Sequence, residues 1–134
     1  MSTPLRLLIV DDSENDALLI ERDLAKNGYD LYCERVYTPE TLQSALAATE
    51  WDIVISDFIM PRFSGLDALR MVKEGGYGIP FIIVSGKTGE DTAVAAIKAG
   101  ADDYIMKWHL ARLAPAVGRE LIEAAHRRLR KPLC

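Results

Sequence analysis

Short apolar runs alternate with helix-like patterns five times along this chain. The first run, Leu5 to Val10, is continuously apolar, as is typical of a parallel strand that is buried on both faces. The second run, Asp30 to Val36, is less apolar and indicates a strand nearer the sheet edge. We expect strands at about 5–10, 30–36, 52–56, 79–84 and 103–106.

The segments between these runs carry helix signals. Ser13 is a typical N-cap, and Thr38 followed by Pro39 places proline at a first helical position. Alternating strands and helices with short connections predict an α/β domain, in which right-handed crossovers cover both faces of a parallel sheet. The apolar residues that mark the first three helices are Ala17, Leu18, Ile20 and Leu24; Leu42, Ala45, Leu46 and Ala48; and Leu66, Leu69, Met71 and Val72. The fourth helix is short and rich in small residues, namely Ala93, Ala95, Ala96 and Ala99. The last helix is expected to start near Pro115, with Val117, Leu121, Ile122 and Ala125 on its apolar side.

The composition fits one soluble globular domain. The chain has 134 residues, of which 49% are hydrophobic and 27% are charged, and this length can bury a core. A net charge of −4 argues against direct nucleic-acid binding, and no apolar stretch approaches the roughly 20 residues of a membrane span. Cys33 and Cys134 are too few for a disulfide framework. Because the start of the chain does not read as a signal peptide, the expected compartment is the cytoplasm.

Three carboxylates directly follow two of the predicted strands. Asp11 and Asp12 come after Val10, and Asp57 comes after the run that ends at Ser56. Neighbouring parallel strands would bring the three side chains to one sheet edge, where their negative charges repel one another. A hard divalent cation that binds through oxygen, Mg²⁺, would compensate this charge. The pattern therefore predicts a metal site, with one carboxylate as a candidate nucleophile.

Further polar residues fall at the predicted carboxyl ends of strands, where the functional crevice of such sheets lies. The whole set comprises Asp11-Asp12, Asp57 to Pro61 with Gly65, Ser85-Gly86, Tyr104 and Lys107. It resembles the receiver domain of two-component response regulators, from Leu5 to about Arg128. The resemblance implies a flavodoxin-like (βα)5 doubly wound fold with five parallel strands in the order 2-1-3-4-5. It also implies that residues 1–134 form a single receiver domain.

The resemblance gives the acidic residues chemical roles. Asp57 would be the phosphoacceptor, which takes a phosphoryl group from the phosphohistidine of a sensor histidine kinase or a histidine phosphotransfer protein. Asp12, Asp57 and the backbone carbonyl of Ile59 would hold Mg²⁺ directly, and Asp11 would support the ion through water. The implied protein transduces a signal and assists its own phosphorylation, but it is not an enzyme with turnover on a substrate.

Three further residues would respond to the phosphoryl group. Lys107 would pair with one phosphoryl oxygen, and Ser85 would donate a hydrogen bond to another. Tyr104 would change rotamer as Ser85 moves, and would carry the change to the surface built by the fourth helix, fifth strand and fifth helix. The set makes physical sense without the family, because phosphoryl transfer is catalysed mainly by positioning and charge stabilisation.

The chain departs from the usual receiver pattern in two places. Trp108 stands where receivers usually have a proline that follows a cis peptide, and a cis bond before a non-proline costs about 2.5–4 kcal/mol. We therefore expect a trans peptide here, with Trp108 and His109 either in a partner surface or packed over the last helix. Ile59 and Lys87 occupy the positions that tune dephosphorylation in receivers. Apolar Ile59 offers no hydrogen bond to an attacking water, which predicts a long-lived phosphoryl group.

The end of the chain and the function class leave alternatives open. The basic residues from Arg127 to Lys131 form either a solvated helix end or a connection to an output domain, and the last two helices are candidates for homodimerisation. A phosphate-independent interaction module with the receiver fold is the first alternative function. An FMN-binding protein is another, but Asp11-Asp12 would repel its phosphate. An aspartyl-phosphate phosphatase would need a second acid where Ile59 stands.

Overall fold

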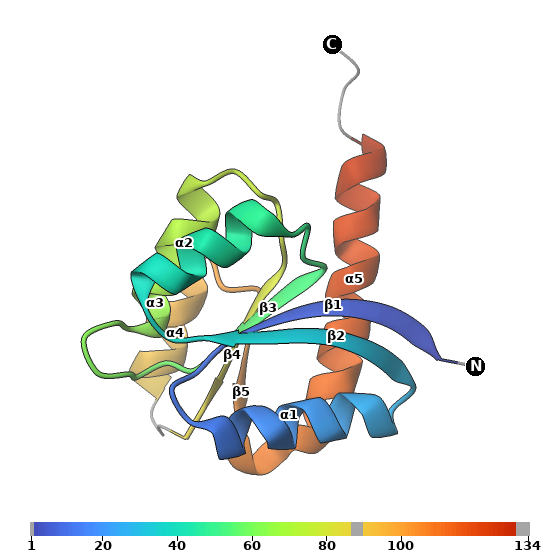
Figure 1. Cartoon of the computed structure of the whole chain (residues 1–134), viewed down its shortest axis with the longest axis horizontal. Helices are drawn as coiled ribbons and strands as arrows, with labels where there is room; N and C mark the ends of the chain where they lie inside the picture. The colour runs from blue at the N-terminus through green and yellow to red at the C-terminus, as the bar shows by residue number, and fades with distance from the viewer. Residues whose placement is uncertain (1, 87–89, 131–134) are drawn as a thin grey trace.

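The structure is a computed structural model that describes residues 2–86 and 90–130 (Figure 1). Lys87, Lys131 and Cys134, for which the sequence raises expectations, lie outside the described residues. Five parallel strands form one sheet in the order β2-β1-β3-β4-β5, which confirms the predicted fold class and strand order. The strands are β1 (Thr3–Val10), β2 (Tyr29–Val36), β3 (Ile53–Ser56), β4 (Phe81–Ser85) and β5 (Asp103–Met106).

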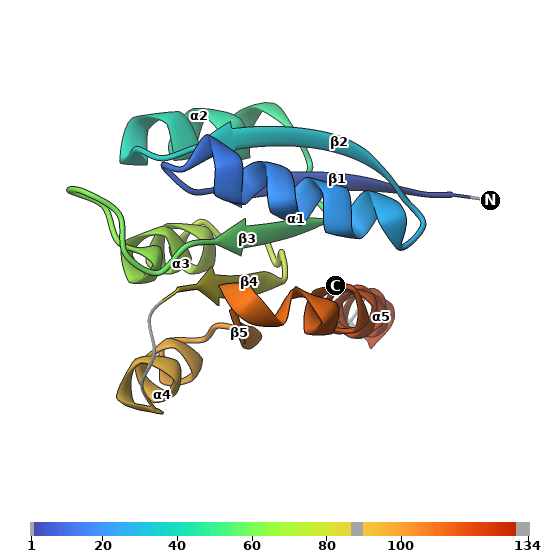
Figure 2. The same cartoon turned by 90° about the horizontal axis from the view of Figure 1, so that it is seen from below.

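Helices cover both faces of the sheet (Figure 2). The first and last helices share one hydrophobic cluster with the strands, and the three helices between them share the other. In the described part of the chain, no helix is both long enough and apolar enough to span a membrane. The helices are α1 (Glu14–Lys26), α2 (Pro39–Ala48), α3 (Gly65–Glu74), α4 (Glu90–Lys98) and α5 (Leu113–Arg130), with a 3₁₀ helix, η1 (Lys107–Arg112), between β5 and α5.

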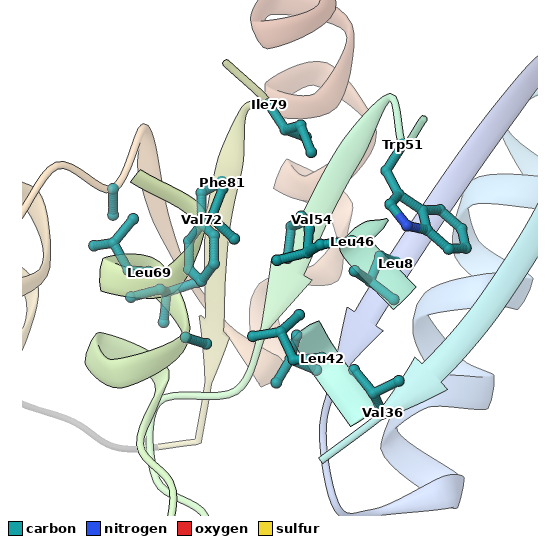
Figure 3. Close-up of a cluster of buried hydrophobic side chains, with 14 of the residues drawn as sticks. Leu8, Val36, Leu42, Leu46, Trp51, Val54, Leu69, Val72, Ile79 and Phe81 are labelled. Atoms are coloured by element: carbon teal, nitrogen blue, oxygen red, sulfur yellow. The ribbon is translucent and has the colours of Figure 1, made fainter. Parts of the chain in front are cut away.

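Strand β1 shows why the apolar runs are continuous. Leu8 and Val10 belong to the cluster with α2, α3 and α4, whereas Leu7 and Ile9 belong to the cluster with α1 and α5. Figure 3 shows the first of these clusters, with Leu8 among its labelled side chains. Each fully buried side chain of this kind contributes about 1.5–3 kcal/mol relative to exposure. Burial on both faces fixes the register of the strands, and the register fixes which residues meet at the strand ends.

Strand β2 lies at one edge of the sheet, as its more polar sequence predicts. Among the described strands it pairs only with β1, over its whole length. Asp30, Tyr32 and Glu34 are exposed, whereas Leu31 and Cys33 are half-buried. Burial raises the pKa of the Cys33 thiol to about 12, so this cysteine stays protonated at neutral pH.

Side-chain caps set the helix starts where the sequence predicts them. Ser13 Oγ accepts a hydrogen bond from the Asp16 N–H (3.2 Å), and Thr38 Oγ1 accepts one from the Thr41 N–H (3.1 Å). Residues 11–13 alone connect β1 to α1. Because this connection is so short, the first turn of α1 lies beside the carboxyl end of β1.

The prediction for the last helix was wrong in two respects. α5 begins at Leu113 rather than near Pro115, because residues 107–112 form the 3₁₀ helix η1. Ile122 is 58% exposed and Ala125 is also exposed, so neither faces the core. Ile122 lies on the side of α5 opposite the buried residues, and the last turns of the helix project away from the sheet (Figure 1). The α5 residues that are buried are Leu113, Ala116, Val117, Glu120 and Ala124.

Two other residues with the helical spacing of the core positions, Leu18 and Ala48, are exposed. Ala48 is the last residue of α2, where the chain turns away from the sheet. In α4, the helix rich in small residues, Ala95 is exposed as well. α4 covers the sheet near β5, the edge strand on that side, so only a narrow stripe of the helix around Ala96 is buried.

Candidate functional site

The register of the central strands brings three carboxylates together. β1 and β3 pair in parallel with Val10 opposite Ser56, so the residues that follow each strand emerge side by side. The Asp57 N–H donates a hydrogen bond to the Val10 carbonyl (2.8 Å), which continues this pairing by one residue. Carboxylate oxygens of Asp11, Asp12 and Asp57 all lie within 4.8 Å of one another.

Asp57 and Asp11 are each held by a backbone N–H. The Phe58 N–H donates to Asp57 Oδ1 (2.8 Å), and the Ser13 N–H donates to Asp11 Oδ1 (2.9 Å). Both carboxyls have raised pKa values, mainly because burial penalises the charged form, although Lys107 and these backbone bonds act in the opposite direction. Asp11 is buried, Asp57 is 13% exposed and Asp12 is exposed, so the site opens to solvent on the Asp12 side.

Lys107 is the cation at the centre of the site. Its Nζ lies 3.3 Å from Asp57 Oδ2, 3.4 Å from Asp11 Oδ2 and 2.6 Å from Asp16 Oδ2. Burial alone would lower the pKa of Lys107, but the hydrogen bond to Asp16 and the charges of Asp11 and Asp57 outweigh burial and raise it to about 12. The ammonium is therefore charged at any physiological pH.

Asp16 is the residue of this site that sequence reasoning missed. It lies in the first turn of α1, where an acidic residue is common because it interacts favourably with the helix dipole. The available signal was the short connection between β1 and α1, which forces this turn to lie next to the strand ends.

The loop after Lys107 follows the expectation of a trans peptide. Within residues 2–86 and 90–130 there is no cis peptide bond, and Lys107 begins η1 directly after β5. Trp108 is 56% exposed, and its ring contacts that of His109 edge to face, with 6.2 Å between centroids. This degree of exposure favours the alternative in which Trp108 belongs to a partner surface.

Ser85 lies on β4, the strand next to β3, and Tyr104 lies on β5, the strand beyond it. Ser85 is the last residue of β4 and is buried, and Tyr104 is a buried residue of β5, paired in register with Ile83. The ring of Phe58, the residue after Asp57, meets the Tyr104 ring edge to face, with 6.2 Å between centroids. The loop that carries Asp57 therefore touches Tyr104 directly, a contact that the sequence does not reveal.

Gly65 lets the start of α3 approach the Asp57 loop closely. Its N–H donates to the Phe58 carbonyl (2.8 Å), and a Cβ at this position would lie 2.3 Å from the Asp57 carbonyl oxygen. No side chain fits at this distance, so glycine is required. Ile59 belongs to the same loop and its side chain is 53% exposed, while the role of its carbonyl as a metal ligand stays a prediction.

The donor set of the site fits Mg²⁺. The clustered ligand atoms of Asp11, Asp12 and Asp57 are all carboxylate oxygens, the hard ligands that Mg²⁺ prefers. Two cations lie close by, since Lys107 contacts the carboxylates and Arg35 Nη1 donates to the Asp11 carbonyl (3.2 Å). The carboxylates, with Asp16 added, still outnumber these positive charges, and a divalent cation would relieve the excess.

Solved structures of other proteins share this architecture. The signal receiver domain assigned to a Luxo repressor protein from Vibrio parahaemolyticus matches with a TM-score of 0.83 and 26% identity, over 97% of this chain and 99% of that chain. The receiver domain of a signal transduction histidine kinase from Syntrophus aciditrophicus matches with a TM-score of 0.75 and 30% identity, over 89% of this chain and 91% of that chain. NtrX from Brucella abortus matches at 0.81 and 26%, over 96% of this chain but 28% of NtrX.

The family profile agrees with the geometry of the site. The profile of the response regulator receiver domain matches residues 7–117, a range that contains the acidic cluster and Lys107. Receiver domains are phosphoacceptors of two-component signalling rather than classical enzymes, and they bind Mg²⁺ at an acidic pocket. From the profile, the strand order and the shared architecture, this chain belongs to the response regulator receiver family.

Proposed function

We propose that this protein accepts a phosphoryl group on Asp57 from a phosphohistidine partner, in a Mg²⁺-dependent reaction. One observation carries the proposal. The oxygens of Asp57, Asp11 and Asp12 gather within 4.8 Å, while Lys107 Nζ lies 3.3 Å from Asp57 Oδ2. A carboxylate nucleophile beside a cation-binding acidic group and a fixed positive charge is what phosphoryl transfer requires.

The orientation of Asp57 supports its role as the nucleophile. The Phe58 N–H fixes one carboxylate oxygen, and the partial exposure of the side chain leaves room for a partner's phosphohistidine to approach. In the transfer, an Asp57 oxygen bonds to phosphorus as the donor's phosphorus–nitrogen bond breaks. The histidine nitrogen keeps the electron pair of that bond and takes a proton from solvent, so the products are an aspartyl phosphate and a neutral histidine.

Positive charge around Asp57 would stabilise the transfer. Lys107 supplies a cation beside the carboxylate where negative charge spreads over the phosphoryl oxygens. Asp12, Asp57 and the Ile59 carbonyl would hold Mg²⁺, with Asp11 supporting it through water, and the bound ion would offset the charge of the phosphoryl oxygens. Ser85, at the end of β4, would donate a hydrogen bond to one of these oxygens after transfer.

The output of the reaction would be a changed protein surface. Ser85 and Tyr104 would form the switch, and the contact between Phe58 and Tyr104 supports a link from the acceptor loop to β5. The proposed partners are a sensor histidine kinase or a histidine phosphotransfer protein in the cytoplasm, with no direct nucleic-acid contact. An output domain or a homodimer through the C-terminal helices belongs to the same proposal, as does a single receiver domain over residues 1–134.

Phosphorylation of the chain itself is proposed, without turnover on a separate substrate. The alternative, a phosphate-independent interaction module, is favoured by one feature. Trp108 replaces the usual proline of the family and presents an exposed ring beside the site. This surface would serve a partner whether or not Asp57 is modified, so the two functions must be separated by experiment.

The decisive experiment measures intact mass after incubation with Mg²⁺ and acetyl phosphate. We expect one added phosphoryl group in the wild type and none in Asp57→Asn or when EDTA removes Mg²⁺. Asp52→Asn is the matched control, because Asp52 also flanks β3 but lies at its other end, and it should be phosphorylated normally. Absence of the adduct in wild-type protein that binds Mg²⁺ would favour the phosphate-independent module.

A further inference from the structure

The nearest carboxylate to Lys107 is not the proposed acceptor. Lys107 Nζ lies 2.6 Å from Asp16 Oδ2 but 3.3 Å from Asp57 Oδ2 and 3.4 Å from Asp11 Oδ2. The place of Asp16 is fixed by the cap of α1, since its N–H donates to Ser13 Oγ (3.2 Å). Asp16 therefore holds the ammonium from the first turn of α1, whereas Asp11 and Asp57 hold it from the strand ends.

A phosphoryl group on Asp57 would give the Lys107 ammonium new oxygen atoms to pair with. The ammonium has three N–H donors, and three carboxylates already surround it. A phosphoryl group adds roughly −1.5 to −2 charges and new acceptor oxygens beyond the Asp57 carboxylate. Lys107 can pair with these oxygens only if its hold on Asp16 loosens. Asp16 is 35% exposed, so water can solvate its carboxylate when the ion pair opens.

We propose that Asp16 is a positioning residue that restrains Lys107 in the resting protein and competes with the phosphoryl group for its ammonium. The proposal rests on the phosphoryl-acceptor function of Asp57, and it assigns to Asp16 an effect on the rate at which Asp57 is phosphorylated. Asp16 does not belong to the carboxylate cluster of Asp11, Asp12 and Asp57, and it acts through its ion pair with Lys107.

Removal of the Asp16 charge has two consequences of opposite sign. Lys107 becomes free to follow the phosphoryl oxygens, so phosphoryl transfer accelerates when Mg²⁺ is saturating. In the absence of phosphate, the freed ammonium moves closer to Asp57 and Asp11 and opposes the binding of another cation there, so Mg²⁺ binds more weakly. Loss of a salt bridge that merely stabilises the fold would not make phosphoryl transfer faster and Mg²⁺ binding weaker at the same time.

The test compares wild type with Asp16→Asn in two assays. The first follows tryptophan fluorescence during Mg²⁺ titration, since Trp108 is the neighbour of Lys107. The second follows intact mass to obtain the initial rate of phosphorylation by acetyl phosphate at saturating Mg²⁺. A partly exposed ion pair is worth about 0.2–1 kcal/mol, so we expect a two- to fivefold rise, roughly, in both the Mg²⁺ dissociation constant and the phosphorylation rate.

Two matched variants control for charge and for folding. Glu14→Gln removes an exposed acid from the same turn of α1 and should leave both quantities unchanged. Asp16→Glu keeps the charge and should restore most of the wild-type behaviour. A slower or unaltered rate in Asp16→Asn, or an equal effect in Glu14→Gln, overturns the proposal. If the wild type takes no phosphate, the function of Asp57 fails, but an unaltered Mg²⁺ constant in Asp16→Asn still overturns the restraint on Lys107.

Discussion

Aspartates flank the strands at both ends of the sheet, but the two ends use them differently. At the amino end, Asp52 precedes β3 and Asp102 precedes β5. Asp52 Oδ2 accepts a hydrogen bond from the Arg6 N–H (2.8 Å), and Asp102 Oδ2 accepts one from the Phe81 N–H (2.8 Å). Each also donates its own N–H to the carbonyl of the same residue on the neighbouring strand. Each carboxylate therefore links the start of its own strand to the backbone of the neighbouring strand.

At the carboxyl end, the aspartates face one another instead. Asp11 and Asp57 lie against Asp12 and share Lys107 with Asp16. Backbone N–H groups hold single oxygens there, but the negative charges exceed the positive ones. The difference teaches that a strand-flanking aspartate is structural when the backbone of the next strand satisfies it. It becomes a candidate for chemistry when other carboxylates crowd it.

Glycine substitutions should produce the largest difference in stability loss between the two ends of the sheet. A Cβ on Gly65 would collide with the Asp57 backbone, so Gly65→Ala should destabilise the fold by about 3 kcal/mol and disturb the acceptor loop. Gly28, at the amino end, has a φ of +98° but open space around it, so Gly28→Ala should cost about 1 kcal/mol. Urea unfolding of both variants measures the difference, and equal losses would contradict the close approach.

Mg²⁺ should stabilise the carboxyl end alone. At a concentration ten times its dissociation constant, the ion should raise the free energy of unfolding by about 1.4 kcal/mol, because it binds only the folded site. Asp12→Asn should lose most of this gain, whereas Asp52→Asn should keep it. Thermal unfolding with and without EDTA provides the measurement, and a full gain in Asp12→Asn would place the ion elsewhere.

Loss of one negative charge should have opposite effects at the two ends. Asp57→Asn keeps an acceptor for the Phe58 N–H and relieves repulsion, so it should stabilise the Mg²⁺-free protein by about 1 kcal/mol. Asp102→Asn weakens a charge-assisted hydrogen bond to the Phe81 N–H and should destabilise by about 1 kcal/mol. Urea unfolding in EDTA measures the change in the free energy of unfolding of each variant. A change of the same sign in both would contradict the difference between the two ends of the sheet.

The smallest expected effect is on the pH dependence of stability. The pKa values of Asp11 and Asp57 are raised, mainly by burial, so the folded state binds their protons more tightly than the unfolded state does. Their contribution therefore makes the protein more stable as the pH falls from neutrality toward 3.8, the ordinary value. The advantage of Asp57→Asn over wild type should shrink as the pH falls from neutrality toward 3.8 in EDTA. A constant or growing advantage would show that burial does not penalise the charged Asp57.

The sequence predicts the sheet and the acidic cluster well, for identifiable physical reasons. Continuous apolar runs require burial on both faces, and parallel strands bring their carboxyl ends to one edge. Asp11, Asp57 and Lys107 therefore meet at the edge that the pattern predicts. Their chemical roles rest on the family resemblance and stay predictions until phosphorylation is measured.

The sequence does not predict features that depend on how the elements pack. Asp16 has the pattern of an ordinary acid in a first helical turn, and only the packing of α1 beside η1 brings it to Lys107. Ile122 is apolar, but it lies on the side of α5 opposite the buried residues Val117, Glu120 and Ala124. The spacing of apolar residues indicates one side of a helix, whereas the packing of the helix decides which side is buried.

The outer edge of β2 has a consequence for how copies of this protein behave when crowded. An unpaired strand edge is a template on which a second chain can add its own strand and begin to aggregate. Asp30 and Glu34 are exposed on this edge strand, so a second copy that paired there would bring like charges close together. Replacement of both residues by neutral ones should therefore make the folded protein associate at a lower concentration, although neither residue belongs to the site.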